Sequence, residues 1–494
     1  VWKNIDNLER IVQQNKQGDS DQQNTAELLE PLVRQARMLG EKYDCVVTNP
    51  PYMGNKGLNS KLKGYAQQRY SNSKTDLFAM FIERNFELNK SLRYVSLITM
   101  QSWMFLSSFE QFRKWILDNK TILNMAHLGA RAFEAISGEV VQATVFSCLN
   151  KEIKEFKPTF FRLVEKDEKE KKQSLIARKN IYIHLKLVDF QKIPGCTIAY
   201  WLSENVIKSF EIERVKKWTI SEGQNKTANN DSYVRNIWEV PASSIGMNKK
   251  WLPYAKGGGY RKWYGNREYL IDWSESAREH YRKDSNCRII KEYLWYKRGI
   301  TWTLLTSSKQ SFRLLEEAET FDMTGSSIFV KDNYSIFYLL AFLNSKVAEI
   351  LNKTFNPTLA LQIKNVRDLP IIIRHKEVVV DLTSRLLSEE KFDWNSYEIS
   401  LDFTILPLLD PSHKAYSVDT TYATLRAFWQ ERTQQVQRLE QENNRIFIEA
   451  YSLQDELTSE VPLEEITLTC NPYYRYGANK SEEELEALLR TDTM

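Results

Sequence analysis

Residues 43–52 read YDCVVTNPPY, and this stretch decides the fold class. Its first part, Tyr43–Thr48, is a short run rich in β-branched residues, which is typical of a buried strand. The strand stops at Asn49, and Pro51 disfavours the helical region for Pro50, so the chain leaves the strand in an extended turn. Open α/β sheets bind their ligands at this end of a strand. The stretch therefore predicts a strand that presents a stiff polar turn at a binding edge.

Helices and strands alternate on both sides of this stretch. The helical apolar spacing of residues 26–39 indicates that residues 1–42 are helical. Further helices are expected at residues 75–89 and 109–119, and further strands at residues 93–99, 122–128 and 140–149. This alternation favours an open, mostly parallel sheet. The last two strands have no helix between them, which favours an antiparallel edge.

A region of different composition follows a highly charged connection at residues 165–179. Residues 190–375 are rich in tryptophan, and residues 249–313 hold 15 Lys and Arg against 6 Asp and Glu. Basic side chains neutralise phosphates and exposed rings stack on bases, so this stretch is a candidate DNA-contact region. The DNA-contact candidates are Arg261, Lys262, Trp263, Lys297 and Arg298. In the alternative interpretation the tryptophans fill a core and the charges form a solvated face.

The chain is expected to be helical after residue 376. Apolar residues alternate in steps of four and three, with two polar positions, along Leu425, Trp429, Arg432, Val436, Leu439, Asn443 and Ile446. This heptad pattern favours a helical hairpin packed on its own domain over an intermolecular coiled coil. The acidic tail from Ser481 is expected to be helical or frayed.

Composition narrows the setting in which the protein works. The net charge of +4 decides nothing about partners. Five dispersed cysteines without a C-x-x-C pair indicate a reduced cytoplasmic setting, and neither they nor the five histidines show metal-ligand spacing, so no metal is expected. No apolar run approaches 18 residues and no signal peptide is visible, so no membrane association is expected.

The turn at residues 49–52 has a specific chemical use. The exocyclic amine of a base is a poor nucleophile because its lone pair is delocalised into the ring. Two acceptors on its N–H bonds, the side-chain oxygen of Asn49 and the carbonyl of Pro50, would free that lone pair. Pro50 and Pro51 stiffen the backbone in advance, and Tyr52 can stack on a base swung out of the duplex. The alternative is that a proline turn merely ends a strand.

These four residues in this setting resemble the catalytic motif of amino-methyltransferases that act on adenine N6. Three further segments follow in that family's order: KTDLF at 74–78, LITMQSW at 97–103, where Met100 replaces the usual proline, and LGARAF at 128–133. The resemblance implies that Asn49, Pro50, Pro51 and Tyr52 are catalytic. It further implies that Asp76 and Phe78 contact S-adenosyl-L-methionine, and that Phe133 stacks with Tyr52 on the flipped base. Asp76 could instead favour a helix N-terminus, and Phe78 could belong to the core.

Residues 339–370 and 461–477 resemble the large PglX methyltransferases of BREX phage-defence systems. This resemblance implies site-specific N6-adenine methylation of double-stranded DNA that marks host DNA. It also implies other BREX defence proteins as partners, and phage-encoded inhibitors as possible ones.

The predicted fold is α/β with three parts. A Rossmann-like methyltransferase sheet occupies residues 1–185, a mixed α+β target-recognition domain 186–375, and a helical region 376–494. The family's Gly-rich donor-binding loop is not matched before residue 43, so the chain is expected to be a fragment that alone does not methylate. Two alternatives stay open: the methyltransferase part of a fused restriction-modification enzyme, and a non-catalytic scaffold that binds DNA or a partner.

Overall fold

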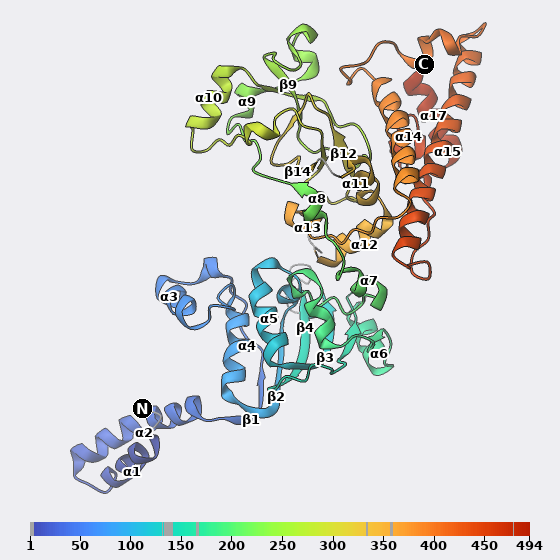
Figure 1. The fold of residues 1–494 in the computed structure, drawn as a ribbon. Coiled ribbons are helices and arrows are strands. Elements are labelled where there is room, and N and C mark those ends of the chain that lie inside the picture. Colours follow the sequence, from blue (N-terminus) through green and yellow to red (C-terminus); the bar gives the residue numbers. More distant parts are fainter. Residues whose placement is uncertain are drawn as a thin grey trace. The chain divides into compact units, whose positions relative to one another are not determined.

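The predicted strand at residues 43–48 is the first strand of a six-stranded sheet in the N-terminal unit (Figure 1). The computed structural model describes residues 4–130, 132, 142–164, 167–331, 334–355, 359–477 and 479–494. Its contacts divide the chain into two units, 1–202 and 203–494. In the first unit the strands are β1 Tyr43–Thr48, β2 Asn89–Met100, β3 Thr121–Gly129, β4 Ala143–Leu149, β5 Thr159–Arg162 and β6 Ile181–Tyr182. Its helices are α1 Ile5–Asn15, α2 Ser20–Gly40, α3 Ser60–Arg69, α4 Leu77–Leu88, α5 Glu110–Asn119 and α6 Glu168–Ile176.

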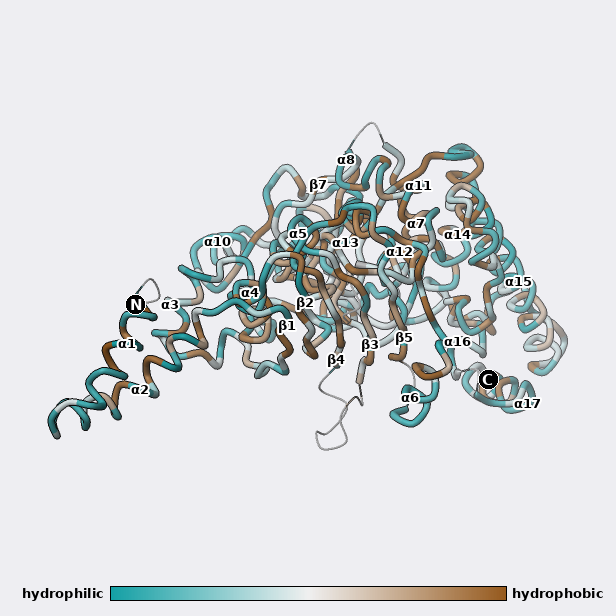
Figure 2. Tube along the Cα trace, turned by 90° about the horizontal axis from the view of Figure 1, so that it is seen from below, coloured by the Kyte–Doolittle hydropathy of each residue, from teal (hydrophilic) through white to brown (hydrophobic). Residues whose placement is uncertain are grey.

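The sheet has the strand order β1-β2-β4-β3-β5-β6. β1 and β2 run parallel, whereas β4 runs antiparallel to both of its neighbours, β2 and β3. The sequence predicted antiparallel pairing at an edge, and that position is wrong, because β4 lies inside the sheet. Its register explains why: Phe146 of β4 sits between Leu97 of β2 and Met125 of β3, and all three side chains are buried. The insertion thus continues one apolar face across three strands. Figure 2 shows β3 and β4 side by side, with hydrophobic residues (brown) in both.

Helix α4 covers the β1–β2 part of the sheet. It packs against both strands, and it buries Phe78, Ile82 and Phe86. Asp76 caps its N-terminus by accepting a hydrogen bond from the backbone N–H of Phe78. Because Asp76 is the cap, the helix expected at residues 75–89 begins at Leu77.

The helical segment expected at residues 1–42 is a hairpin of two helices, α1 and α2, which lie side by side (Figure 1). The chain turns at residues 16–19, and Asp19 forms a capping box at the start of α2. Lys16 and Glu30 form an ion pair across the hairpin at 2.7 Å. Several apolar side chains of α2 stay exposed: Leu28, Leu29, Leu32, Met38 and Leu39.

The second unit contains two four-stranded sheets, ordered β13-β9-β10-β8 and β12-β11-β14-β7. Its strands are β7 Thr219–Ile220, β8 Val234–Asn236, β9 Trp251–Ala255, β10 Tyr269–Asp272, β11 Gly299–Trp302, β12 Phe312–Leu315, β13 Thr320–Phe321 and β14 Ser327–Val330. Helices among and after them are α7 Glu204–Ser209, α8 Val215–Trp218, α9 Asn230–Tyr233, α10 Glu275–Lys283, α11 Ile336–Leu343, α12 Lys346–Phe355 and α13 Ile363–Arg367. The C-terminal helices are α14 Lys376–Asn395, α15 Val418–Ala450, α16 Pro472–Tyr476 and α17 Glu482–Thr493.

The C-terminal helices belong to the same unit as the two sheets. α14 packs on α11, and α15 packs on α12 and α14, so the boundary predicted at residue 375 falls inside this unit. The apolar residues of the heptad pattern on α15 are buried within the chain, as expected for a helical hairpin packed on its own domain. Arg432, one of the two polar positions of that pattern, pairs with Glu389 of α14 at 2.5 Å. The acidic tail forms α17, which buries Leu485 and Leu489. None of the helices in the described part of the chain is long and apolar enough to cross a bilayer.

Candidate active site at the end of strand β1

Three strands deliver their C-terminal ends to one edge of the sheet. β1 and β2 are parallel, and β3 runs in their direction because β4 is antiparallel to both β2 and β3. Met100 of β2 and Gly129 of β3 lie opposite the same residue of β4, Ala143. The turn that begins at Asn49 is therefore at the edge where β2 and β3 also end, as expected for a ligand-binding edge.

The four residues of the motif differ in exposure. Asn49 and Pro51 are exposed, Pro50 is buried, and Tyr52 is half-buried. The ring of Tyr52 meets Phe78 edge to face, with ring centroids 6.1 Å apart. Its hydroxyl is buried without a hydrogen-bond partner among the described residues, and burial raises its pKa. A buried backbone at Pro50 beside an exposed amide at Asn49 gives a fixed turn with an accessible acceptor.

Asp76 ties the loop after the motif to the start of α4. One carboxylate oxygen accepts hydrogen bonds from the backbone N–H of Met53 at 3.1 Å and of Phe78 at 3.3 Å. The backbone N–H of Leu77 donates to the carbonyl of Met53 at 3.0 Å, which closes the connection. Burial raises the pKa of Asp76, and these backbone donors partly offset the rise. Asp76 thus holds the position of the segment that follows Tyr52.

The aromatic residues Phe78 and Trp103, in the second and third segments of the family resemblance, are buried. Phe78 is fully buried and packs on Phe109, with ring centroids 5.7 Å apart. Trp103 is also fully buried, against Phe112 and Phe146. Phe133 lies outside the residues that the structure describes. Asp76 and Phe78 therefore support the turn that ends in Tyr52 and the loop that follows it.

Two supporting contacts were missed by the sequence interpretation. The side-chain amide of Asn85, buried on α4, donates to the hydroxyl of Thr48 at 2.8 Å. Arg113, buried on α5, donates to the carbonyls of Trp103 and Leu106 and so holds the turn that follows β2. A buried Asn or Arg inside an otherwise apolar helix face is the signal that could have found both.

His127 links the ends of β2 and β3. Its Nε2 lies 2.5 Å from Oε1 of Gln101 and its Nδ1 lies 2.9 Å from the hydroxyl of Tyr200. Because the amide oxygen of Gln101 can only accept, Nε2 carries the proton and Nδ1 accepts from Tyr200. Burial, helped by the charge of Arg162, lowers the pKa of His127 to about 3. The imidazole is therefore neutral at physiological pH and serves as a fixed cross-link.

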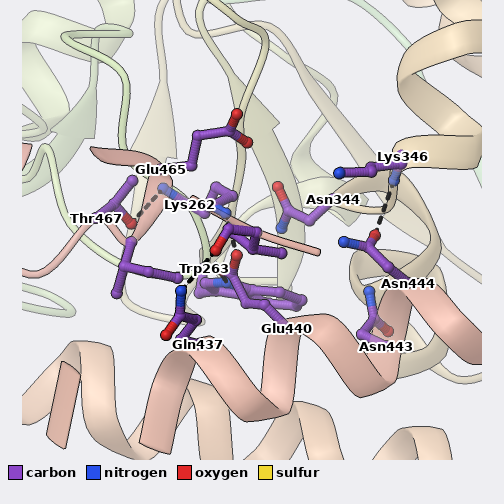
Figure 3. Close-up of polar contacts among 12 residues, drawn as sticks. Lys262, Trp263, Asn344, Lys346, Gln437, Glu440, Asn443, Asn444, Glu465 and Thr467 are labelled. Carbon is purple, nitrogen blue, oxygen red and sulfur yellow. Dashed lines mark hydrogen bonds and ion pairs between the residues drawn. The ribbon is translucent and has the colours of Figure 1, made fainter. Parts of the chain in front are cut away.

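The structure buries three of the five predicted DNA-contact residues. Arg261, Lys262 and Trp263 are 3%, 5% and 1% exposed. Arg261 pairs with Asp393 of α14 at 2.8 Å. Glu440 of α15 pairs with Lys262 and accepts from the indole N–H of Trp263 at 2.7 Å (Figure 3). Their charges are neutralised inside the protein, so in this structure they join the sheets to the C-terminal helices.

The other two predicted DNA-contact residues, Lys297 and Arg298, are exposed. Arg298 pairs with Glu316 at 3.2 Å. Lys297 has no ion pair within the described ranges of the chain. Of the five candidates, these two are placed where a phosphate could reach them.

Although the sequence shows no metal-ligand spacing, the structure brings one His, one Asp and one Cys side chain together. His280, Asp284 and Cys287 bring one potential ligand atom each to within 4.8 Å of one another. Helix α10 ends at Lys283, and a turn closed by a hydrogen bond from the backbone N–H of Cys287 to the carbonyl of Asp284 brings the thiol back to His280. The thiol of Cys287 donates to the carbonyl of Thr227 at 3.1 Å, and burial raises its pKa.

Comparison with known proteins agrees with this geometry. A family model of Eco57I restriction-modification methylases matches residues 2–133. The adenine-specific methyltransferase BrxX of Escherichia coli O9:H4 (strain HS) is 38% identical over 493 residues, which cover 99% of this chain and 40% of BrxX. The adenine-specific methyltransferase PglX of Lacticaseibacillus casei (strain Zhang) is 35% identical, with 92% of this chain and 40% of PglX covered. This chain is a homologue of part of these methyltransferases.

The chain spans about two fifths of the length of both relatives. The resemblance predicted from residues 49–133 and from the C-terminal segments is confirmed by this homology. Among solved structures, the type IIL restriction-modification enzyme MmeI in complex with DNA superposes with a TM-score of 0.50 at 10% identity. That match covers 87% of this chain and 57% of MmeI, and it supports the α/β fold class.

Proposed function

We propose that this chain carries the catalytic part of a site-specific DNA methyltransferase that methylates N6 of adenine. One observation carries the proposal: Asn49, exposed, and Pro50, buried, stand at the end of β1, on the edge where β2 and β3 also end. Both curated relatives are named adenine-specific methyltransferases, which supports the choice of base.

The turn activates the amine by holding two acceptors in place. The side-chain oxygen of Asn49 and the carbonyl of Pro50 accept the two N–H bonds, so the lone pair of the amine is turned toward the methyl donor. Because the prolines fix the backbone before the base arrives, little ordering is left to the reaction step. The methyl group comes from S-adenosyl-L-methionine, which supplies it as an electrophile.

The base must leave the duplex to reach this turn. Tyr52 offers a half-buried ring whose orientation is fixed by Phe78, and it stacks on the flipped adenine. Phe133 is proposed as a second stacking ring on the resemblance alone. Asp76 and Phe78 are proposed to lie on the side of the methyl donor. Asp76 holds the loop after Tyr52, and Phe78 packs against the ring of Tyr52.

The donor pocket is proposed to be incomplete in this chain, which would then be inactive alone. Its support is that Phe78 is fully buried and the carboxylate of Asp76 is engaged by backbone N–H groups. Calorimetric titration with S-adenosyl-L-methionine tests this. Tight binding by the 494-residue chain alone would overturn it.

The second unit is proposed to recognise double-stranded DNA, with Lys297 and Arg298 as contacts to phosphate. MmeI, whose fold is shared, was solved in complex with DNA.

A fused restriction-modification enzyme is the second candidate, since the matching family model and MmeI are both described as restriction-modification proteins. A nuclease assay on the protein at its natural length separates the candidates: cleavage of unmethylated DNA favours the restriction enzyme.

We place the methylation in BREX phage defence, where it marks host DNA and the protein acts with other BREX proteins. The support is the homology to BrxX and PglX. Phage-encoded inhibitors would be expected to target such a protein.

Methylome sequencing of cells that express the protein at its natural length tests the catalytic proposal. The native protein and Asn55→Ala, a control in the same exposed loop, are expected to place N6-methyladenine in one DNA motif. Asn49→Ala is expected to abolish it. If no strain gains methylation with the partner proteins present, the chain is a DNA-recognition scaffold and the proposal is wrong.

A further inference from the structure

A cavity of about 220 Å³ lies within the second unit. Rings and aliphatic side chains line one part of it, among them Tyr260, Trp263 and Phe312. Helix α15 lines another part with Glu440, Asn443 and Asn444, and Figure 3 shows this helix running beside Lys262 and Trp263. The cavity therefore combines flat apolar walls with amides, as sites for small polar aromatic ligands do.

Several polar groups of the lining are already used by the fold. Asn344 accepts from the backbone N–H of Phe312 at 3.0 Å and donates to its carbonyl at 2.9 Å. Asn444 accepts from the backbone N–H of Lys346 at 3.0 Å and donates to Ser459. Glu440 is occupied by Lys262 and Trp263. These groups hold the walls of the cavity together, and their hydrogen bonds are made within the protein, so they do not call for a ligand.

Three other amides of the lining have a buried side-chain oxygen without a hydrogen-bond partner: Gln310, Asn352 and Asn443. Asn443 is 1% exposed, and its nitrogen donates to the carbonyl of Ala341 at 3.0 Å, which fixes the oxygen as the free acceptor. Buried acceptors without partners are uncommon because they lose their hydration without compensation. Three of them around one cavity call for an occupant that brings several N–H donors.

Three of the four lysines that line the cavity are paired with its glutamates, which leaves one lysine in excess. Its lining holds four lysines and three glutamates. Lys262 is buried and pairs with Glu440. Lys309 and Lys353 are more exposed; Lys309 pairs with Glu465, and Lys353 pairs with Glu349. A phosphate at the mouth would share these lysines with the glutamates.

We propose that this cavity binds one nucleotide whose base carries an exocyclic amino group. Gln310, Asn352 and Asn443 would accept from the base, the apolar walls would cover its faces, and the lysines would attract the phosphate. The volume is below the roughly 300–1,000 Å³ of sites for drug-sized ligands, which limits the occupant to about one nucleotide. The nucleotide is either free or an unpaired residue of a DNA strand. The inference does not depend on methyl transfer.

Equilibrium titration of the 494-residue chain with dAMP, dCMP and dTMP tests the proposal, with a single-stranded oligonucleotide as a further probe. We expect dAMP and dCMP to bind at least tenfold more tightly than dTMP, because thymine lacks the exocyclic amine. Binding of adenine- or cytosine-containing oligonucleotides without binding of free nucleotides identifies a strand as the source. Equal binding of dTMP, or no binding by any probe, overturns the proposal.

Two substitutions separate a ligand site from a structural role. Gln310→Leu and Asn352→Leu remove an unpartnered acceptor, and neither breaks a side-chain hydrogen bond within the described residues. Both are expected to weaken nucleotide binding at least tenfold while the melting temperature stays the same or rises. Gln441→Leu, on α15 outside the lining, is the control and should leave both unchanged. Binding that persists in both lining variants contradicts the proposal.

Discussion

The side-chain amide of Asn85 donates to the hydroxyl of Thr48 at 2.8 Å, one residue before Asn49. Helix α4 thereby fixes the last residue of β1 from inside the protein. On its other side, Asp76 holds the backbone N–H of Met53, one residue after Tyr52. Asn85 and Asp76, which lie outside the motif, thus hold its four residues at both ends.

Removing the Thr48 hydroxyl should loosen the turn without touching it. Thr48→Val leaves the buried amide of Asn85 without its acceptor, which costs about 1–3 kcal/mol of stability. Because a displacement of about 1 Å can cost 10²-fold in rate, methyl transfer by the protein at its natural length is expected to fall at least tenfold. Thr121→Val is the control, since it removes a buried hydroxyl at the opposite end of β3. If both variants lose activity equally, the effect is general instability.

His127 should make the first unit sensitive to acid. Burial lowers the pKa of His127 to about 3, from an ordinary value of 6.5. Between pH 6.5 and pH 3 the imidazole is therefore protonated in the unfolded chain and neutral in the folded chain. The free energy of unfolding is thus full above pH 6.5 and decreases as the pH falls toward 3. His127→Phe should flatten the decline of the urea midpoint between pH 7 and pH 4. It should also lower that midpoint at pH 8, because Tyr200 and Gln101 lose their partner. An unchanged slope would show that His127 is charged in the folded protein.

Glu390 should give the second unit the opposite pH dependence. Burial raises the pKa of Glu390 to about 8, and the charge of Arg261 only partly offsets it. Although Glu390 lies 3.5 Å from Arg261, the carboxylate that pairs with this arginine at neutral pH is Asp393, at 2.8 Å.

The folded chain keeps the proton of Glu390 that the unfolded chain has lost, so this stability falls as the pH rises from 4.5 through 8. Glu390→Gln should remove the decline and raise the melting temperature at pH 9, by about 2–4 °C for each kcal/mol regained. Scanning calorimetry at pH 6 and pH 9 measures this. A variant that melts lower than the native chain at both values, with the same pH slope, contradicts it.

Arg261 and Lys297 should respond differently to substitution. Arg261→Met leaves Asp393 buried without its partner and should destabilise the chain by about 3–5 kcal/mol. Lys297→Ala should change stability by less than about 0.5 kcal/mol and lower the salt slope of DNA binding by about one. Fluorescence anisotropy over a salt series, with Lys480→Ala as a charge-matched control, measures the slope. If the salt slope of Lys297→Ala equals that of the native protein, Lys297 does not contact a phosphate.

The position of β1 and its turn was predictable because a short β-branched run and two prolines act locally; the predicted burial of this strand is wrong, since Cys45 and Val47 are exposed. The position of β4 was not, because it depends on pairing with β2 and β3, which the order of strands along the chain does not specify. Arg261 and Lys262 show the same limit. Their carboxylate partners lie 132 and 178 residues away, and a basic aromatic run has the same pattern whether phosphates or buried carboxylates face it.

The ion pairs of Arg261 and Lys262 with α14 and α15 affect how DNA specificity could be re-engineered. A chimaera that grafts only residues 186–375 from a relative would separate these cations from Asp393 and Glu440. Wherever the grafted segment lacks the matching residue, Asp393 or Glu440 would be left as a buried charge without its partner. Under the proposed DNA recognition by the second unit, the segment to exchange is the whole of residues 203–494, with its C-terminal helices included.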